Sequence, residues 1–245
     1  MVGREICWIY AKRLEVIFES ALRDQLSVLR RELPWEKVEA EYVFEGADGN
    51  ETLADLFGNK SQLVVYHFMF GPDWEEGCKS CSLLADHYEP SVLHLKYRDV
   101  SMVTVSRAPL EKLAAFKRRM GWTFKWVSSL NNEFNFDYQA SFSKEAEAKN
   151  EIYYNYRSAK FMSSEGPGIS VFYKDDQANI FHTYSAYSRG LDMFIGAYHL
   201  LDLVPKGRDE DDLQYGMQWV RHKDRYDDPS VVDQWTQVIA TKGKF

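Results

Sequence analysis

Two cysteines separated by two residues carry the clearest chemical signal in this chain of 245 residues. The segment Cys78-Lys79-Ser80-Cys81 follows an apolar run, 63–70, with the length and composition of a strand covered on both faces. If a helix begins at Cys78, both sulfurs lie on its first turn, and its partial positive charge favours a thiolate. The pattern indicates thiol–disulfide chemistry, in which Cys78 is the nucleophile and Cys81 resolves the mixed disulfide.

Charged residues close to Cys78 act in opposite directions on its pKa. Asp73, Glu75 and Glu76 precede it, and carboxylates disfavour a thiolate. Lys79 and the helix dipole favour it. We expect Cys78 to be exposed and Cys81 to be covered, and the sequence leaves open which charges prevail.

Arg107 is the next candidate, because it ends the apolar strand predicted over 100–106. Chemistry in open α/β sheets gathers at the carboxyl ends of the parallel strands. A guanidinium there could lower the pKa of the thiol or hold an anionic substrate. The alternative is an ion pair with an acidic residue of the cysteine loop.

Composition restricts the classes of partner. The net charge of −7 argues against binding to nucleic acid or to an anionic membrane surface. No apolar stretch approaches membrane-spanning length, and charged residues interrupt any secretory signal near the N-terminus, so we expect a cytoplasmic protein. Three cysteines do not make a disulfide framework.

Hydrophobic periodicity predicts alternating strands and helices around the cysteine pair. The predicted helices and strands are a helix over 14–33, the strand 63–70, a helix over 82–95, the strand 100–106, a helix over 110–120, a hairpin of 168–173 with 178–184, and a closing helix over 190–204. A βαβ unit followed by a ββα unit predicts an α/β fold with a central mixed sheet and helices on both faces.

Three regions are predicted around this core. They are an N-terminal helical extension (1–36) that packs on the domain or on a partner, the α/β domain itself (37–206), and a C-terminal tail (207–245). Residues 208–212 are acidic and predict a solvated link. The segment from Trp219 to His222 is too patterned for disorder, and a solvated tail helix is favoured over folding back across the site.

These residues resemble the thioredoxin superfamily. The strand 63–70 followed by Cys78-x-x-Cys81 is one half of the match, and the segment 167–176 is the other. The resemblance implies a thioredoxin-like fold in which Pro167 is a cis-proline that shapes the substrate groove. Trp74 is then either a lid over the disulfide or hydrophobic cover. Copper-delivering relatives use two cysteines and a distant histidine, so Cys78, Cys81 and His182 form an alternative metal site; otherwise no metal or cofactor is expected.

More specifically, the segment from Tyr66 to Cys78 is similar to a bacterial thioredoxin-like family catalogued as a domain of unknown function (DUF899), related to the alkyl hydroperoxide reductase/thioredoxin-like group. The resemblance covers residues 14–226. Two departures stand out. Gly77 occupies the place where thioredoxins have Trp, and Gly71 and Glu75 replace the Pro and Thr of the peroxiredoxin motif.

The favoured function is that of a thiol–disulfide oxidoreductase with a protein or small-molecule disulfide or thiol as substrate and a separate electron donor. One alternative is a peroxide reductase, in which Cys78 becomes a sulfenic acid and Cys81 condenses with it. Others are a metal-binding or redox-sensing module without turnover, an interaction scaffold, and, for the quaternary state, a homodimer.

Overall fold

The computed structural model describes residues 2–149, 151–161 and 163–226, and side chains from residue 16 onward with the exception of residue 159. The predicted tail, 207–245, therefore lies partly outside the described residues.

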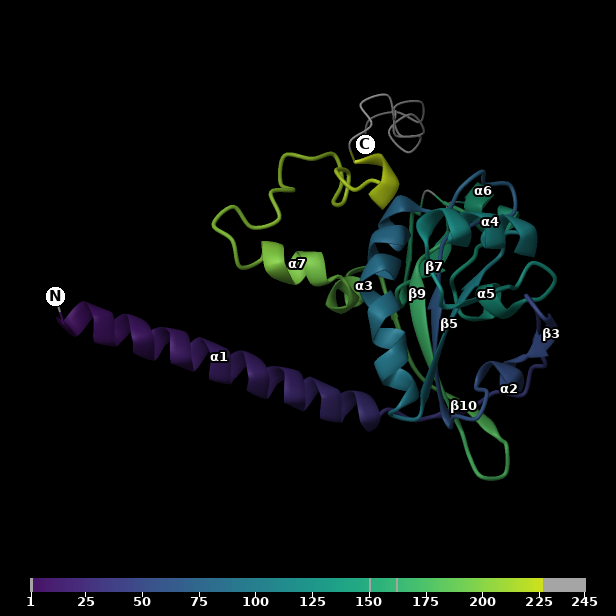
Figure 1. Ribbon diagram of the computed structural model, residues 1–245, viewed down its shortest axis with the longest axis horizontal. Coiled ribbons are helices and arrows are strands. Elements are labelled where there is room, and N and C mark those ends of the chain that lie inside the picture. Colours follow the sequence, from purple (N-terminus) through teal and green to yellow (C-terminus); the bar gives the residue numbers. More distant parts are fainter. Residues whose placement is uncertain (1, 150, 162, 227–245) are drawn as a thin grey trace.

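A single mixed sheet of eight strands organises the domain (Figure 1). Its order is β1-β10-β9-β4-β5-β6-β2-β3, with β4, β5 and β6 parallel and β9 and β10 antiparallel to their neighbours. The strands are β1 (Glu36–Lys37), β2 (Val43–Gly46), β3 (Gly49–Thr52), β4 (Gln62–His67), β5 (Val100–Ser106), β6 (Lys125–Ser128), β9 (Gly168–Lys174) and β10 (Ile180–Tyr187), and a separate ribbon pairs β7 (Ile152–Tyr154) with β8 (Arg157–Ala159).

Helices connect and cover these strands. They are α1 (Val2–Arg31), α2 (Leu53–Leu56), α3 (Lys79–Lys96), α4 (Leu110–Met120), α5 (Phe134–Asp137), α6 (Lys144–Lys149) and α7 (Gly196–Leu201), with the 3-10 helices η1 (Ser188–Phe194) and η2 (Lys223–Arg225). Within the described ranges every helix is too short or too polar to span a lipid bilayer.

The connection order is that of a thioredoxin-like fold. The chain runs β4-α3-β5-α4 and later β9-β10-α7, and the four core strands lie in the order β5-β4-β9-β10. This arrangement confirms the predicted fold class. It also confirms the hairpin predicted over 168–184.

Alternation along β4 divides the core into two layers. Leu63 and Val65 face a cluster that α2 and α5 cover, whereas Tyr66 and Phe68 face a cluster that α3, α4 and α7 cover. Successive side chains of a strand point to opposite faces, so helices on both sides of the sheet follow from this sequence. The cysteines lie in the second layer.

The prediction of one continuous closing helix over 190–204 is wrong. Two helices, η1 and α7, meet at Ile195, whose backbone is not helical. At the break, His87 accepts a hydrogen bond from the Ala197 amide at 3.0 Å. A side chain at Gly196 would begin 3.0 Å from the same ring, so a contact with α3 interrupts the helix.

The two ends of the described chain differ in how they pack. Helix α1 extends away from the domain (Figure 1), and its apolar side chains Phe18, Leu22 and Leu26 are each about half exposed or more. The C-terminal segment instead packs back, with Val220 fully buried and His222 nearly so. The predicted solvated tail helix is therefore wrong, because these side chains find an apolar surface beside α4.

Candidate active site

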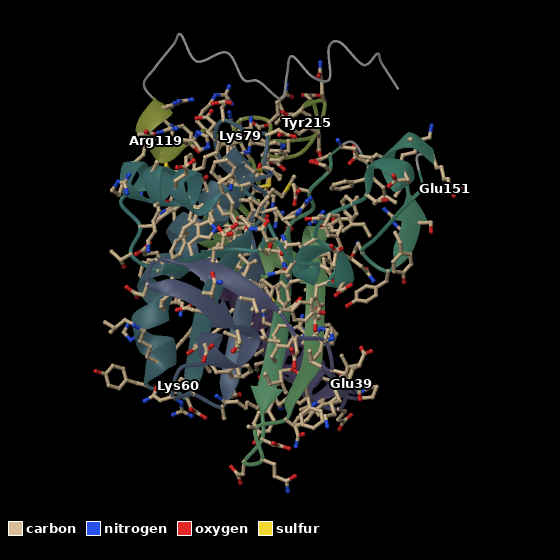
Figure 2. The ribbon with its side chains drawn as sticks, turned by 90° about the vertical axis from the view of Figure 1, so that its right-hand side faces the viewer. Glu39, Lys60, Lys79, Arg119, Glu151 and Tyr215 are labelled. Atoms are coloured by element: carbon tan, nitrogen blue, oxygen red, sulfur yellow. The ribbon has the colours of Figure 1, made fainter. Side chains whose placement is uncertain are left out.

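The cysteine pair lies at the carboxyl end of the parallel strands. Cys78 is the N-cap of α3, which begins at Lys79. Figure 2 shows Lys79 and Arg119 near one end of the molecule, while Lys60, which precedes β4, lies toward the opposite end. This edge is where open α/β sheets hold their ligands.

Both cysteines are free thiols, and both are buried. Cys78 is 8% exposed and Cys81 is 2% exposed, so the expectation of an exposed Cys78 is wrong. The cysteine loop also passes close to two rings: a side chain at Gly77 would begin 2.6 Å from Phe68 and 2.9 Å from Phe116. That crowding explains why glycine, and not tryptophan, precedes Cys78.

The two thiols have opposite pKa shifts. A hydrogen bond from the Cys81 thiol is the main cause that holds the pKa of Cys78 below its ordinary value, and it is aided by the backbone N–H groups of Cys81 and Ser80. Burial raises the pKa of Cys81 well above its ordinary value. These opposite shifts favour the outer sulfur over the inner sulfur as the thiolate, with the inner sulfur as its hydrogen-bond donor.

The acidic residue of the loop that is nearest to Cys78 in the sequence forms ion pairs with two arginines. Glu76 accepts hydrogen bonds from Arg119 at 2.7 Å and from Arg225 at 3.0 Å. Ion pairing of this kind compensates the charge of the carboxylate. It removes much of the conflict that the sequence predicts between the acidic loop and a Cys78 thiolate.

A cavity of about 420 Å³ opens onto both sulfurs. Cys78, Cys81 and Pro167 line it together, so the structure brings these three predicted residues into one place. The prediction of a cis-proline is wrong, since no cis peptide bond occurs in the described chain. Pro167 is part of the cavity wall with a trans bond.

Tyr66 is a residue of this cavity that sequence reasoning missed. Its hydroxyl is buried, forms no hydrogen bond within ordinary geometry, and neighbours the Cys81 sulfur. Burial, followed by the electrostatic effect of Cys81, raises the pKa of Tyr66 well above its ordinary value. A tyrosine in the middle of an apolar strand was the available signal, because buried tyrosines usually find a polar partner.

Trp74 lies beside the cysteine loop, outside the set of described residues that line the cavity. Its ring packs on Gly71, where an added side chain would begin 2.9 Å from the indole nitrogen. Lys112 binds the carbonyl groups of Pro72 and Trp74 at 3.2 and 3.0 Å, which fastens this loop to α4. The role of Trp74 as part of the substrate groove stays a prediction.

Arg107 pairs with a carboxylate from outside the cysteine loop. Its guanidinium lies 3.3 Å from Glu165 and stacks at 4.3 Å on the ring of Phe136. Glu165 is fully buried, and burial raises its pKa to about 7 in spite of Arg107 and a hydrogen bond from Ser141. Arg107 is not among the described residues that line the cavity, and its partner Glu165 lies two residues before Pro167, which does line it.

The structure does not bring His182 to the cysteine pair. His182 lies on β10 opposite Glu36 and binds Ser185 at 2.7 Å, and it lines a different cavity. Among the described residues no group of three or more potential ligands is placed to hold a metal ion. The three-residue metal site predicted from Cys78, Cys81 and His182 is therefore wrong.

The C-terminal segment supplies further site residues. His222 donates to the Gly77 carbonyl at 2.8 Å, Lys79 donates to the Gln218 carbonyl at 3.1 Å, and Met217 lines the cavity. The patterned stretch from Trp219 to His222 was the signal for such contacts. Its partners are more than 100 residues away in the chain, so the sequence does not identify them.

Comparison with known proteins identifies the family of this chain. The family model described as "Bacterial protein of unknown function (DUF899)" matches residues 7–226. No curated protein matches the chain.

Solved structures that are similar to this chain at low identity include peroxiredoxins. Peroxidoxin BcpB from Mycobacterium tuberculosis is 12% identical, with a TM-score of 0.45, over 67% of this chain and 94% of that one. Peroxiredoxin Q from Xanthomonas campestris is 12% identical, with a TM-score of 0.46, over 67% of this chain and 95% of that one.

Proposed function

The chain belongs to the bacterial family DUF899, and from its site we propose that it is a thiol–disulfide oxidoreductase. The observation that carries this proposal is the cysteine pair itself. Two free thiols at the start of α3 have opposite pKa shifts and share one cavity. A stabilised thiolate beside a protonated thiol is what the two successive exchange steps require.

The reaction uses each sulfur in turn. The Cys78 thiolate attacks one sulfur of a substrate disulfide, the S–S bond breaks, and the leaving thiolate takes up a proton. Cys81 then loses its proton and attacks the Cys78 sulfur, which releases the second thiol and leaves a disulfide between Cys78 and Cys81. A dithiol electron donor returns the pair to its reduced form, and a reducing compartment such as the cytoplasm would supply one.

The test is equilibration of the metal-stripped protein in graded glutathione redox buffers, with the state of the two cysteines read by alkylation and mass. We expect one two-electron transition between the dithiol and an internal disulfide. A pair that stays reduced throughout, or that forms mixed disulfides without an internal one, would contradict the proposal.

Two variants separate the roles of the sulfurs. Cys81→Ser should accumulate the mixed disulfide on Cys78, whereas Cys78→Ser should form none. If Cys78→Ser retained the exchange activity, the assignment of the nucleophile would be wrong.

Peroxide reduction is the second candidate, and burial of Cys78 within a cavity favours it. A sulfenic acid shielded from other thiols would condense with Cys81. The positions of the peroxiredoxin motif hold Gly71 and Glu75, so this chemistry would depend on other groups. Peroxide consumption no faster than that of a free thiol would dispose of it.

We also propose that the protein is a homodimer joined through α1, whose apolar side chains face solvent in the single chain. This part of the proposal is independent of the chemistry at Cys78.

A further inference from the structure

The cavity over the cysteines has a wall that belongs to the C-terminal part of the chain. Arg208, Glu210 and Met217 line it, together with residues of η1. Its volume of about 420 Å³ is within the range of sites for small organic molecules, about 300–1,000 Å³. Access to Cys78 therefore depends on how firmly this wall is held.

Glu210 ties the wall together. Its carboxylate accepts hydrogen bonds from the Tyr198 hydroxyl at 2.9 Å, from the Trp219 indole at 2.6 Å and from the Met217 amide at 3.0 Å. These donors come from α7 and from two points of the C-terminal segment. Hydrogen bonds to a carboxylate are the stronger kind, so the three together fix the course of the chain.

Arg208 fastens the wall to η1 and α7. It donates two parallel hydrogen bonds to Asp202, both at 2.8 Å, and a third at 2.8 Å to Asp192. Its guanidinium also lies 3.8 Å from the centre of the Tyr198 ring. Because these charges pair with each other, the charged groups of the wall are engaged within the protein.

The wall is joined to the cysteine loop as well. Lys79 and His222 bind backbone carbonyls across this junction, at 3.1 and 2.8 Å. Only 8% of Cys78 is exposed. In a folded protein the backbone continues on both sides of each cysteine of a disulfide, and this wall occupies the space which that backbone would need.

The interior of the cavity is mostly apolar. Its lining includes Met69, Leu84, Leu191, Ile195 and Met217. The Tyr66 hydroxyl is a buried polar atom in this lining, beside the Cys81 thiol but outside ordinary hydrogen-bond geometry to it, and it is able to donate a hydrogen bond to an entering oxygen or sulfur. An apolar molecule with a single acceptor atom matches this surface.

On the basis of the proposed function, we propose that the site takes small organic disulfides and excludes the disulfides of folded proteins. The substrate RSSR accepts two electrons and two protons to become two RSH. Cys78 and Cys81 lose the same electrons and become joined by a disulfide, which a dithiol reductant then opens.

The experiment compares two disulfides in single-turnover reactions of the reduced full-length protein. The probes are bis(2-hydroxyethyl) disulfide and insulin, and each rate is divided by the rate with dithiothreitol to correct for intrinsic reactivity. We expect the corrected rate for the small disulfide to exceed that for insulin by at least about 100-fold. Equal corrected rates would overturn the inference, whereas no reaction with either probe would overturn the proposed function and the inference with it.

Loosening the wall provides the second arm. Trp219→Ala removes the indole ring together with its N–H donor to Glu210, whereas Trp219→Phe removes the donor and keeps an aromatic ring in the wall. We expect Trp219→Ala to increase the insulin rate about tenfold and Trp219→Phe to increase it less. If limited proteolysis shows that the segment of Trp219→Ala has opened and insulin is still not reduced, the wall is not the barrier and the inference is wrong.

Discussion

At the scale of single residues, Tyr66 is placed to act on the second step of the exchange. Its buried hydroxyl neighbours the Cys81 thiol without reaching it in ordinary hydrogen-bond geometry, and this interaction acts to lower the pKa of Cys81, against the larger effect of burial. When Cys81 gives up its proton, the hydroxyl can donate to the new thiolate. We expect Tyr66→Phe to slow resolution of the mixed disulfide by roughly 10- to 100-fold, since a hydrogen bond to a charged group contributes about 1.5–3 kcal/mol.

The same variant should stabilise the fold. A buried hydroxyl without a partner costs about 1 kcal/mol or more, so its removal should raise the free energy of unfolding by about that amount. Tyr88→Phe is the matched control, because the Tyr88 hydroxyl already binds Thr104 and its loss should lower stability without affecting the resolving step. An equal slowing in both variants would contradict a specific role for Tyr66.

Glu165 makes stability depend on pH. Burial raises its pKa from 4.5 to about 7. As pH rises above 4.5, the unfolded chain loses this proton before the folded protein does. The stabilising contribution of Glu165 to the free energy of unfolding is therefore fully present below pH 4.5 and declines until about pH 7. At about 1.4 kcal/mol for each pH unit, the decline amounts to about 3 kcal/mol.

Glu165→Gln should remove this part of the pH dependence. We expect the variant to lose less stability than the parent between pH 5 and pH 8 in urea titrations. Glu147→Gln is the control, because Glu147 is an exposed carboxylate that contributes only a minor effect on Glu165. Parallel stability profiles for the parent and Glu165→Gln would show that the Glu165 carboxyl titrates normally.

At the scale of elements, Arg119 on α4 holds the C-terminal segment onto the cysteine loop. It donates to Asp224 at 2.7 and 3.0 Å and to Glu76 at 2.7 Å. Arg119→Ala should increase hydrogen exchange of the amides between 218 and 226 about fivefold, which corresponds to about 1 kcal/mol for a partly exposed network. The measurement is exchange followed by mass spectrometry.

An ion pair elsewhere provides the comparison. Lys125 binds Glu51 at 2.6 Å at the other side of the sheet. Lys125→Ala should leave exchange in the segment 218–226 unchanged. If both variants gave the same increase, the effect would reflect general destabilisation and not the loss of the Arg119 contacts.

Elements with a regular period were predictable from the sequence, and contacts between distant segments were not. The strand predicted over 63–70 and the hairpin over 168–184 follow from local apolar patterns, and the fold follows from their order. The break at Ile195 depends on His87, and the packing of His222 depends on Gly77. Neither contact leaves a period in the sequence.

The site shows the same division. The spacing of Cys78 and Cys81 fixes their position on a helix, so local reasoning places the pair correctly. The burial of Cys78 depends on a wall that begins more than 100 residues later, and the partner of Arg107 is Glu165, 58 residues away. Such arrangements follow from topology and side-chain packing together.

At the scale of the whole molecule, the packing of a single chain does not explain the exposed apolar face of α1. Its residues Phe18, Leu22, Leu26 and Leu29 are between 47% and 67% exposed. Their spacings of three and four form one stripe, which is the pattern of a seam between two helices. An isolated helix gains most of its stability from packing such a face, and a second copy of the chain offers the same stripe in a two-fold contact.

We therefore expect a dimer at micromolar concentration in sedimentation velocity, converted to a monomer by the paired change Leu22→Glu and Leu26→Glu. The control is Ser20→Glu with Ser27→Glu, which adds the same charge on the opposite face of the helix, given about 100° of rotation for each residue. This control should remain dimeric. The glutathione equilibration of Cys78 and Cys81 should be the same in all three proteins, because none of the described side chains of α1, which begin at residue 16, lines the cavity. A parent protein that sediments as a monomer would show that α1 does not join two copies of the chain, and it would leave the chemistry proposed for the cysteine pair standing.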